Sequence, residues 1–79
     1  MSARILFFGV TADIASEREI EVSLSSGSTA KNVLETIRQR IPGLDEHKLH
    51  ISLNQQFATG EEIVKDGDEL AIFAAVSGG

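Results

Sequence analysis

The sequence has no cysteine, no tryptophan and no tyrosine, and it has one proline among its 79 residues. Without cysteine the chain cannot form disulfides or a zinc site with thiolate ligands. Four phenylalanines are its aromatic residues. A chain of this length forms one small domain at most, and 42% hydrophobic residues are enough for an efficiently packed core.

Basic residues are also few, since seven Lys and Arg stand against twelve Asp and Glu, giving a net charge of −5. A surface that binds nucleic acid phosphates needs the opposite sign, so we expect no nucleic acid partner. A negative charge instead steers the domain toward a basic protein partner.

Long apolar runs are missing as well. The opening MSARILFFGV is too short for a membrane span or a secretory signal, and it passes into polar residues at once. The absence of cysteine fits a reducing compartment. We therefore expect a soluble cytoplasmic domain without a membrane partner.

Five segments predict strands, one of them short. Residues 4–10 are apolar on both faces, as in a central strand, whereas residues 18–25 alternate strictly, as in a half-buried strand. Residues 49–53 alternate too, and a short segment around Phe57 follows them. After the Asp66-Gly67 turn signal, residues 70–73 form the predicted last strand. The connection between the first two strands is expected to be a loop.

One helix is predicted between the second and third strands. Thr29 is a candidate N-cap, and Pro42 with Gly43 ends the segment. Apolar residues recur at helical spacing and form one stripe: Ala30, Val33, Leu34, Ile37 and Ile41.

These elements predict an α+β fold, a mixed sheet of about five strands with one main helix across one face. This is the order of elements in a β-grasp, the ubiquitin-like roll, over residues 1–73, followed by a flexible tail at 74–79. An unrelated α+β sandwich has the same elements in another pairing, and sequence pattern alone does not separate the two.

Strand parity predicts an uncovered apolar face. Neighbours in a strand point to opposite faces, so Phe7 and Phe8 cannot both lie under one helix, and neither can Ile72 and Phe73. Either loops shield the residue of each pair that faces away from the helix, or that face docks another protein. The feature recurs in two predicted central strands, which favours docking.

The residues give little sign of chemistry within the chain. His47 and His50, with Asp45 and Glu46 nearby, lack the spacing of a metal site and fit a solvated loop better. No glycine-rich phosphate-binding loop is present, and Ser77 has no candidate base. We therefore predict no metal site, no bound cofactor and no autonomous active site.

One reactive group remains, the terminal carboxylate of Gly79. It can attack the α-phosphorus of ATP to give an acyl-adenylate, provided that it enters a partner's active site. Six extended residues, 74–79, reach about 20 Å, and two terminal glycines pass a narrow channel because they carry no Cβ. The alternative interpretation is an ordinary frayed end.

Four short motifs carry a resemblance to a known family. ILFFG followed by TADI, then LNQ at residues 53–55, DGDELAIF at 66–73 and the final VSGG together resemble the small subunit of molybdopterin synthase. That family belongs to the ubiquitin-like sulfur carriers, and the likeness runs nearly from end to end.

The resemblance implies a role and partners. An E1-like activating enzyme that uses ATP would adenylate Gly79 and convert it to a thiocarboxylate. The tail would then enter the large synthase subunit, in a heterotetramer, and donate sulfur to cyclic pyranopterin monophosphate in molybdenum cofactor biosynthesis. Gly78 matches the threading tail. The residues matched to partner contact are Phe8, Phe57, Phe73, Val76 and Ser77.

The sequence departs from the family pattern in two places. Ala74-Ala75 stands where a proline pair is frequent, and Ala12 stands in place of an arginine in the first loop. The alanine-rich tail resembles the sulfur carriers of thiamine thiazole synthesis. A ubiquitin-like modifier conjugated to lysines of target proteins is a third alternative, since its tail chemistry is the same up to the adenylate.

Overall fold

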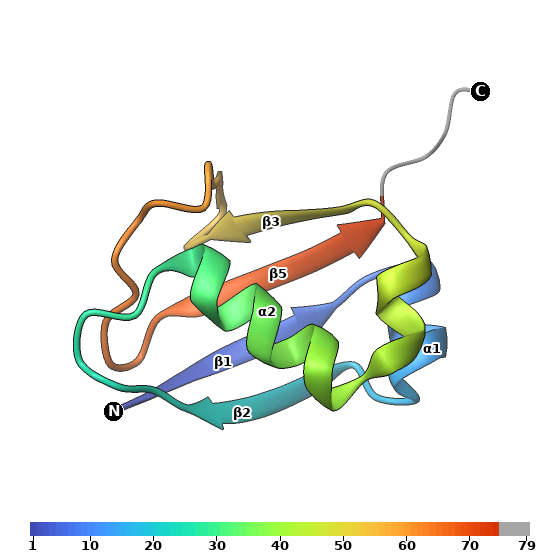
Figure 1. The fold of residues 1–79 in the computed structure, drawn as a ribbon, viewed down its shortest axis with the longest axis horizontal. Helices are drawn as coiled ribbons and strands as arrows, with labels where there is room; N and C mark the ends of the chain where they lie inside the picture. Colours follow the sequence, from blue (N-terminus) through green and yellow to red (C-terminus); the bar gives the residue numbers. More distant parts are fainter. Residues whose placement is uncertain (75–79) are drawn as a thin grey trace.

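The computed structural model describes residues 1–74, and for Asp45 and Glu46 it describes the backbone alone. Within these residues five strands and three helical segments follow one another (Figure 1). Their bounds are β1 (Ser2–Phe7), α1 (Val10–Ala15), β2 (Glu19–Ser23), α2 (Ala30–Arg40), the 3₁₀ helix η1 (Pro42–Glu46), β3 (Leu49–Leu53), β4 (Gln56–Phe57) and β5 (Glu69–Ala74).

The strands form one mixed sheet in the order β2-β1-β5-β3-β4. β1 and β5 pair in parallel at its centre, with Ile5 beside Leu70 and Phe7 beside Ile72. The other neighbouring strands are antiparallel. α2 crosses one face of this sheet (Figure 1). This pairing is the β-grasp roll predicted from the sequence, and it rules out the alternative sandwich.

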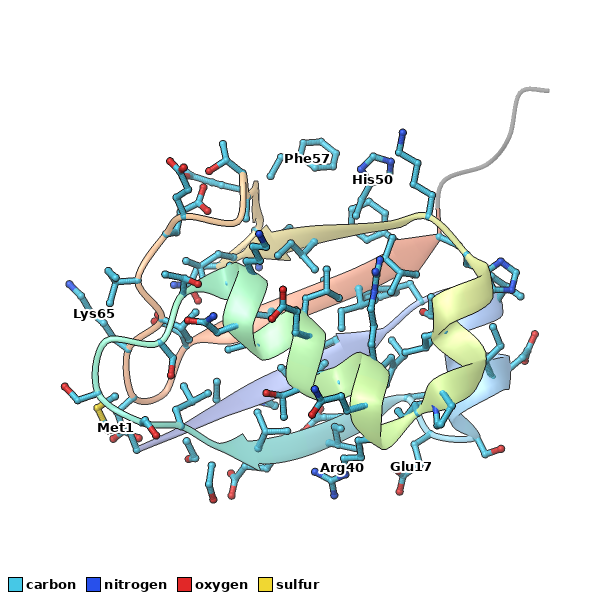
Figure 2. All side chains as sticks on the ribbon, in the orientation of Figure 1. Met1, Glu17, Arg40, His50, Phe57 and Lys65 are labelled. Atoms are coloured by element: carbon cyan, nitrogen blue, oxygen red, sulfur yellow. The ribbon has the colours of Figure 1, made fainter. Side chains whose placement is uncertain are left out.

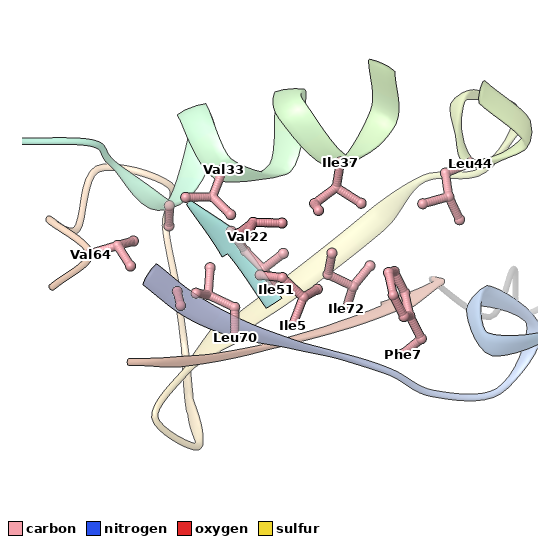
Figure 3. Packing of buried hydrophobic residues seen from close by; sticks show 12 residues of the cluster. Ile5, Phe7, Val22, Val33, Ile37, Leu44, Ile51, Val64, Leu70 and Ile72 are labelled. Atoms are coloured by element: carbon pink, nitrogen blue, oxygen red, sulfur yellow. The ribbon is translucent and has the colours of Figure 1, made fainter. Parts of the chain in front are cut away.

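The core lies between α2 and the face of the sheet beneath it (Figure 3). Ile5 and Ile72 from the central strands are completely buried there, as is Ile37 from α2. A fully buried side chain of this size contributes roughly 1.5–3 kcal/mol. The whole buried cluster is Ala3, Ile5, Phe7, Val22, Ala30, Val33, Ile37, Leu44, Ile51, Val64, Leu70 and Ile72.

α2 begins and ends where the sequence predicts. The Thr29 side chain accepts the Asn32 N–H at 3.2 Å, while the Asn32 side chain accepts the Thr29 N–H at 3.1 Å, so the two form a capping box. Beyond Arg40 the chain enters η1 at Pro42. The predicted apolar stripe is confirmed, because its members are buried or pack against the core.

The end of β1 differs from the prediction. The expected strand over 4–10 stops at Phe7, and Val10 is the first residue of α1, where a loop was expected. Gly9 adopts φ 59°, a left-handed conformation that turns the chain. The buried Thr11 hydroxyl lies 2.9 Å from the Ile72 carbonyl oxygen and fixes α1 against β5.

The other strand predictions hold with small shifts. β3 has the predicted bounds, and the short segment at Phe57 is β4. β2 is shorter at both ends than expected. β5 is one residue longer at each end than the predicted 70–73, so that Ala74, assigned to the tail, is the last residue of the strand.

Two carboxylates hold the loops around β5. Glu62 accepts the N–H groups of Thr59 at 2.8 Å and Gly60 at 2.9 Å, and these bonds lower the pKa of its carboxyl. Asp68 accepts the Lys65 N–H at 2.7 Å and the Asn54 side-chain amide at 3.1 Å, which lowers its pKa as well.

In the part of the chain that the structure describes, no helix has the length and apolar character needed to cross a membrane.

We predict that Thr29→Ala lowers the free energy of unfolding by about 1 kcal/mol, because the N-cap acceptor is lost. Urea denaturation measures this change. Thr36→Ala is the matched control, since Thr36 lies inside α2, is exposed, and bonds only the Asn32 carbonyl one turn earlier. An equal loss of stability in both variants would contradict the assignment of the cap.

Acid should weaken the 59–62 loop. The folded pKa of Glu62 lies below its ordinary value of 4.5, so its bonds stabilise the fold above that pH and are lost as the pH falls through the lowered pKa. We therefore predict that Glu62→Gln flattens the acid limb of stability, measured by urea unfolding at several pH values. Glu61→Gln, which leaves the bonds to Thr59 and Gly60 intact, should keep the limb unchanged.

Candidate functional site

The face of the sheet opposite α2 has no covering element among the described residues (Figure 1). Strand parity and register give its residues. Leu6 of β1 lies beside Ala71 of β5, and Phe73 of β5 lies opposite His50 of β3. Phe57 of β4 lies opposite Ser52. We call these six residues, together with Phe8, the outer face.

An aromatic cluster forms the β5-β3-β4 end of the outer face. The Phe73 ring stacks on His50 with centroids 6.1 Å apart and meets the edge of Phe57 at 5.8 Å. Phe57 is 79% exposed, whereas Phe73 is half-buried beneath its two neighbours. A large exposed aromatic side chain beside a packed one is typical of a protein docking surface.

A tight turn places Phe57 there. Asn54 and Gln55 both have positive φ, 50° and 72°, as a two-residue hairpin of type I′ requires. The Asn54 side chain is held by Asp68, and its own oxygen accepts the Glu69 N–H at 3.0 Å. The hairpin is therefore fixed to the start of β5, and this in turn fixes the position of Phe57 in the sheet.

Phe8 lies just beyond β1 and continues its pairing with β5, since its N–H donates to the Ile72 carbonyl at 3.1 Å. Its side chain is 51% exposed. It lines a hollow of its own, of about 640 Å³, together with residues from the start of α1 and from β2. The structure therefore brings Phe57 and Phe73 into contact and places Phe8 one strand away.

The parity prediction is confirmed. Phe7 and Ile72 are buried under α2, at 3% and 0% exposure, while Phe8 is exposed and Phe73 is half-buried on the opposite side. Beyond the outer face, the same side of the sheet carries charged residues of β1 and β2. There Arg4 and Glu19 form an exposed ion pair at 3.8 Å, which contributes little to stability.

His50 belongs to this surface, and sequence reasoning missed that role. From the sequence, His50 was only a weak candidate for a metal ligand, together with His47. Its alternation with Leu49 and Ile51 in β3 carried the signal, because that parity places it on the outer face. Among the described residues, no three side chains of His, Asp or Glu lie together as metal ligands.

The predicted tail residues lie outside the described part of the chain. They are Val76, Ser77, Gly78 and Gly79. The last described residue, Ala74, lies opposite Leu49 at the start of β3. The described chain therefore ends one residue after Phe73, beside the aromatic cluster.

Comparisons with known proteins agree with this geometry. The sequence is 30% identical to the molybdopterin synthase sulfur carrier subunit of Mycobacterium tuberculosis, over 100% of this chain and 99% of that protein. The fold is similar to SAMP1 of Haloferax volcanii, with TM-score 0.85, 27% identity and full coverage of both chains. It is also similar to a chain in the complex of subunits 1 and 2 of the molybdopterin-converting factor of Helicobacter pylori, with TM-score 0.69, 28% identity and full coverage of both chains.

A family match covers nearly the whole sequence, from residue 5 to residue 79, and so includes both the outer face and the terminal glycines. The chain belongs to the ThiS family.

Proposed function

We propose that this chain is the sulfur carrier subunit of a molybdopterin synthase, acting in molybdenum cofactor biosynthesis. The observation that carries the proposal is the position of the outer face. An uncovered aromatic cluster on β5 immediately precedes a segment that ends in Gly78-Gly79. A carrier needs both features, a surface by which a partner holds it and a terminus that the partner can reach. Likeness to curated sulfur carrier subunits over the whole chain supports the assignment.

The proposed chemistry takes place at the Gly79 carboxylate. An E1-like partner binds ATP, and a carboxylate oxygen attacks the α-phosphorus and releases pyrophosphate. A sulfur donor then displaces AMP from the acyl-adenylate and leaves a thiocarboxylate. Within this scheme the chain itself binds no cofactor or metal, because ATP and the pterin substrate belong to the partners. ATP-dependent activation fits the cytoplasmic location that the sequence predicts.

The proposed partner in sulfur transfer is the large synthase subunit, in a heterotetramer. The Helicobacter pylori complex of subunits 1 and 2 supports a partner of this kind. Phe57 and Phe73 would fill an apolar surface of that partner, and Phe8 would contact it one strand away. Val76 and Ser77 would line the channel through which Gly78 and Gly79 pass.

A second candidate is a protein modifier joined to lysines of target proteins. The likeness to the small archaeal modifier protein 1 of Haloferax volcanii favours it. The sulfur carrier of thiamine thiazole synthesis is a further alternative, suggested by Ala74-Ala75 and by the ThiS family match. Adenylation of the terminus is common to all three functions, which differ in the acceptor.

Mass spectrometry of the protein purified from its native cell separates these functions. A carrier shows the mass gain of one oxygen-to-sulfur exchange at Gly79, whereas a modifier shows isopeptide-linked adducts. Co-purification with a large synthase subunit or with a thiazole synthase then distinguishes the two carriers. A native protein with neither a thiocarboxylate nor an adduct would contradict the proposal.

We predict that deleting Gly79 abolishes sulfur transfer and leaves the fold intact, because the core described within residues 1–74 is built from side chains between Ala3 and Ile72. Transfer is measured as molybdopterin formed with the activating enzyme and the large subunit. Unfolding in urea is the control and should give the same midpoint as the complete chain. Normal transfer by the truncated protein would remove the terminus from the mechanism.

Phe57→Ala should weaken binding to the large subunit about tenfold or more, since exposed aromatic anchors carry much of the affinity of an interface. The free energy of unfolding should fall by less than about 1 kcal/mol, the cost of one aromatic pair. Phe73→Ala should likewise affect binding more than stability.

The matched control is Ile63→Ala, which removes a side chain that is 51% exposed but lies on the loop that bridges to Thr29, away from the outer face. Calorimetric titration measures the affinities. Equal affinity of the Phe57 and Ile63 variants would contradict docking through the outer face.

A further inference from the structure

We propose a second interaction surface, a basic groove between α2 and β3 that takes an acidic, extended segment of a partner protein. The groove has a volume of about 570 Å³ and runs along the β3 edge of the molecule. It is lined by Lys31 and Leu34 of α2, by residues 48–51, and by residues 57–60. It meets the outer face only at its rim, where both include His50 and Phe57. Phe73, at the centre of the proposed docking surface, does not line it.

The backbone along this edge is open at the start of β3. The Asn54 N–H donates to the Glu69 carbonyl at 2.8 Å, and the Ala58 N–H donates to the Ile51 carbonyl at 3.0 Å. Since backbone groups alternate in direction along a strand, those of Leu49 and Ile51 point away from β5. β4 pairs only with Ser52 and Leu53. Within residues 1–74, the outward N–H and carbonyl of Leu49 and the N–H of Ile51 therefore have no strand partner, while the Ile51 carbonyl is taken by Ala58.

Basic side chains flank this open edge. Lys31 stands on the side of α2 that faces β3, and Lys48 immediately precedes β3. Arg38 lies two turns after Lys31 on the same side of α2, and its Nε is buried with no hydrogen-bond partner in the structure. Two of the seven Lys and Arg residues thus line one groove in a chain of net charge −5, and Arg38 lies further along the same side of α2.

Among the described residues, no carboxylate forms an ion pair within 4.0 Å with Lys31 or Lys48. Among described residues the one ion pair within 4.0 Å is that of Arg4 and Glu19, on the opposite half of the sheet. Glu62, near the groove, is engaged by the Thr59 and Gly60 N–H groups. Glu35, four residues after Lys31 on α2, is exposed and is not within 4.0 Å of it.

These features define the chemistry of the occupant. Open backbone donors and acceptors select an extended segment that adds a strand to β3. The partly buried Leu34, Leu49 and Ala58 favour apolar side chains on the inward positions. The ammonium groups favour carboxylates beside them.

The opposite edge of the sheet provides an internal comparison. On β2 the Leu24 N–H donates to the Met1 carbonyl and the Arg18 carbonyl accepts the Phe7 N–H, so Glu19, Glu21 and Ser23 direct their backbone groups outward. This edge is open too, but its glutamates repel an acidic segment. Figure 2 places His50 and Phe57 at the β3 edge of the molecule and Glu17 near β2, at the other edge.

The test is an NMR titration of the full chain with a capped peptide, Asp-Val-Asp-Leu-Asp-Val, and with its lysine counterpart, Lys-Val-Lys-Leu-Lys-Val. The acidic peptide should shift the amides of Leu49, Ile51 and Ala58, and not those of Glu19, Glu21 and Ser23. The lysine peptide should leave the β3 edge unchanged. Added salt should weaken the acidic complex, since the lysines are solvent-exposed.

Charge reversal makes the test specific. Lys31→Glu with Lys48→Glu should weaken binding of the acidic peptide about tenfold or more. Lys65→Glu, which changes an exposed lysine in the turn before β5, should leave it unchanged. No binding, equal binding by the lysine peptide, affinity independent of salt, or equal affinity of the double variant would overturn the proposal. Self-association that shifts the same amides without peptide would identify a second copy as the occupant and would overturn it as well.

Discussion

The parallel pairing of β1 with β5 is the constraint on which the rest of this structure depends. It joins the first and last strands of the described chain at the centre of the sheet, with Ile5 beside Leu70 and Phe7 beside Ile72. α2 lies across one face, so the residues of one parity are buried while Leu6, Ala71 and Phe73 stay on the uncovered side. A small domain with one large helix cannot cover both faces of a central pair. The outer face therefore follows from the topology as much as from the residues that occupy it.

The same pairing places the proposed docking surface next to the start of the terminal segment. β5 ends at Ala74, opposite Leu49, and its penultimate residue is the ring on which the aromatic cluster is built. A partner that binds Phe57 and Phe73 therefore lies next to the start of the terminal segment. Strand pairing and the buried core fix where that segment starts relative to the two rings, so this position does not depend on the partner. In the proposed function, the reach of the terminal carboxylate beyond the aromatic cluster is limited by the length of residues 74–79.

The sequence predicted the elements with local signals and missed those determined by tertiary contacts. α2 was predictable because Thr29, the apolar stripe and Pro42 all lie within it or beside it. α1 was not, since it is held by a bond between Thr11 and Ile72, 61 residues apart. Parity predicted that one residue of each pair, Phe7 with Phe8 and Ile72 with Phe73, leaves the helix-covered face, and the resemblance pointed to Phe8 and Phe73. Parity could not predict that His50 and Phe57 would pack on Phe73, because the order of strands in a sheet depends on pairing between strands and not on the residues of one strand. The terminal residues stay a prediction.

The net charge of the sequence likewise did not predict the charge of each surface, because that depends on tertiary contacts. The sequence total of −5 suggests basic partners alone, but a partner meets local groups of charges. Glutamates follow β2 and its open edge, where Glu19 pairs with Arg4, whereas Lys31 and Lys48 line the groove beside β3. Screening limits the reach of each group to about 10 Å at moderate salt, so a partner senses the local patch and not the total. The two edges of the sheet therefore differ in the charged side chains that flank their outward backbone groups, and this difference arises from how α2 and the loops distribute a small number of side chains.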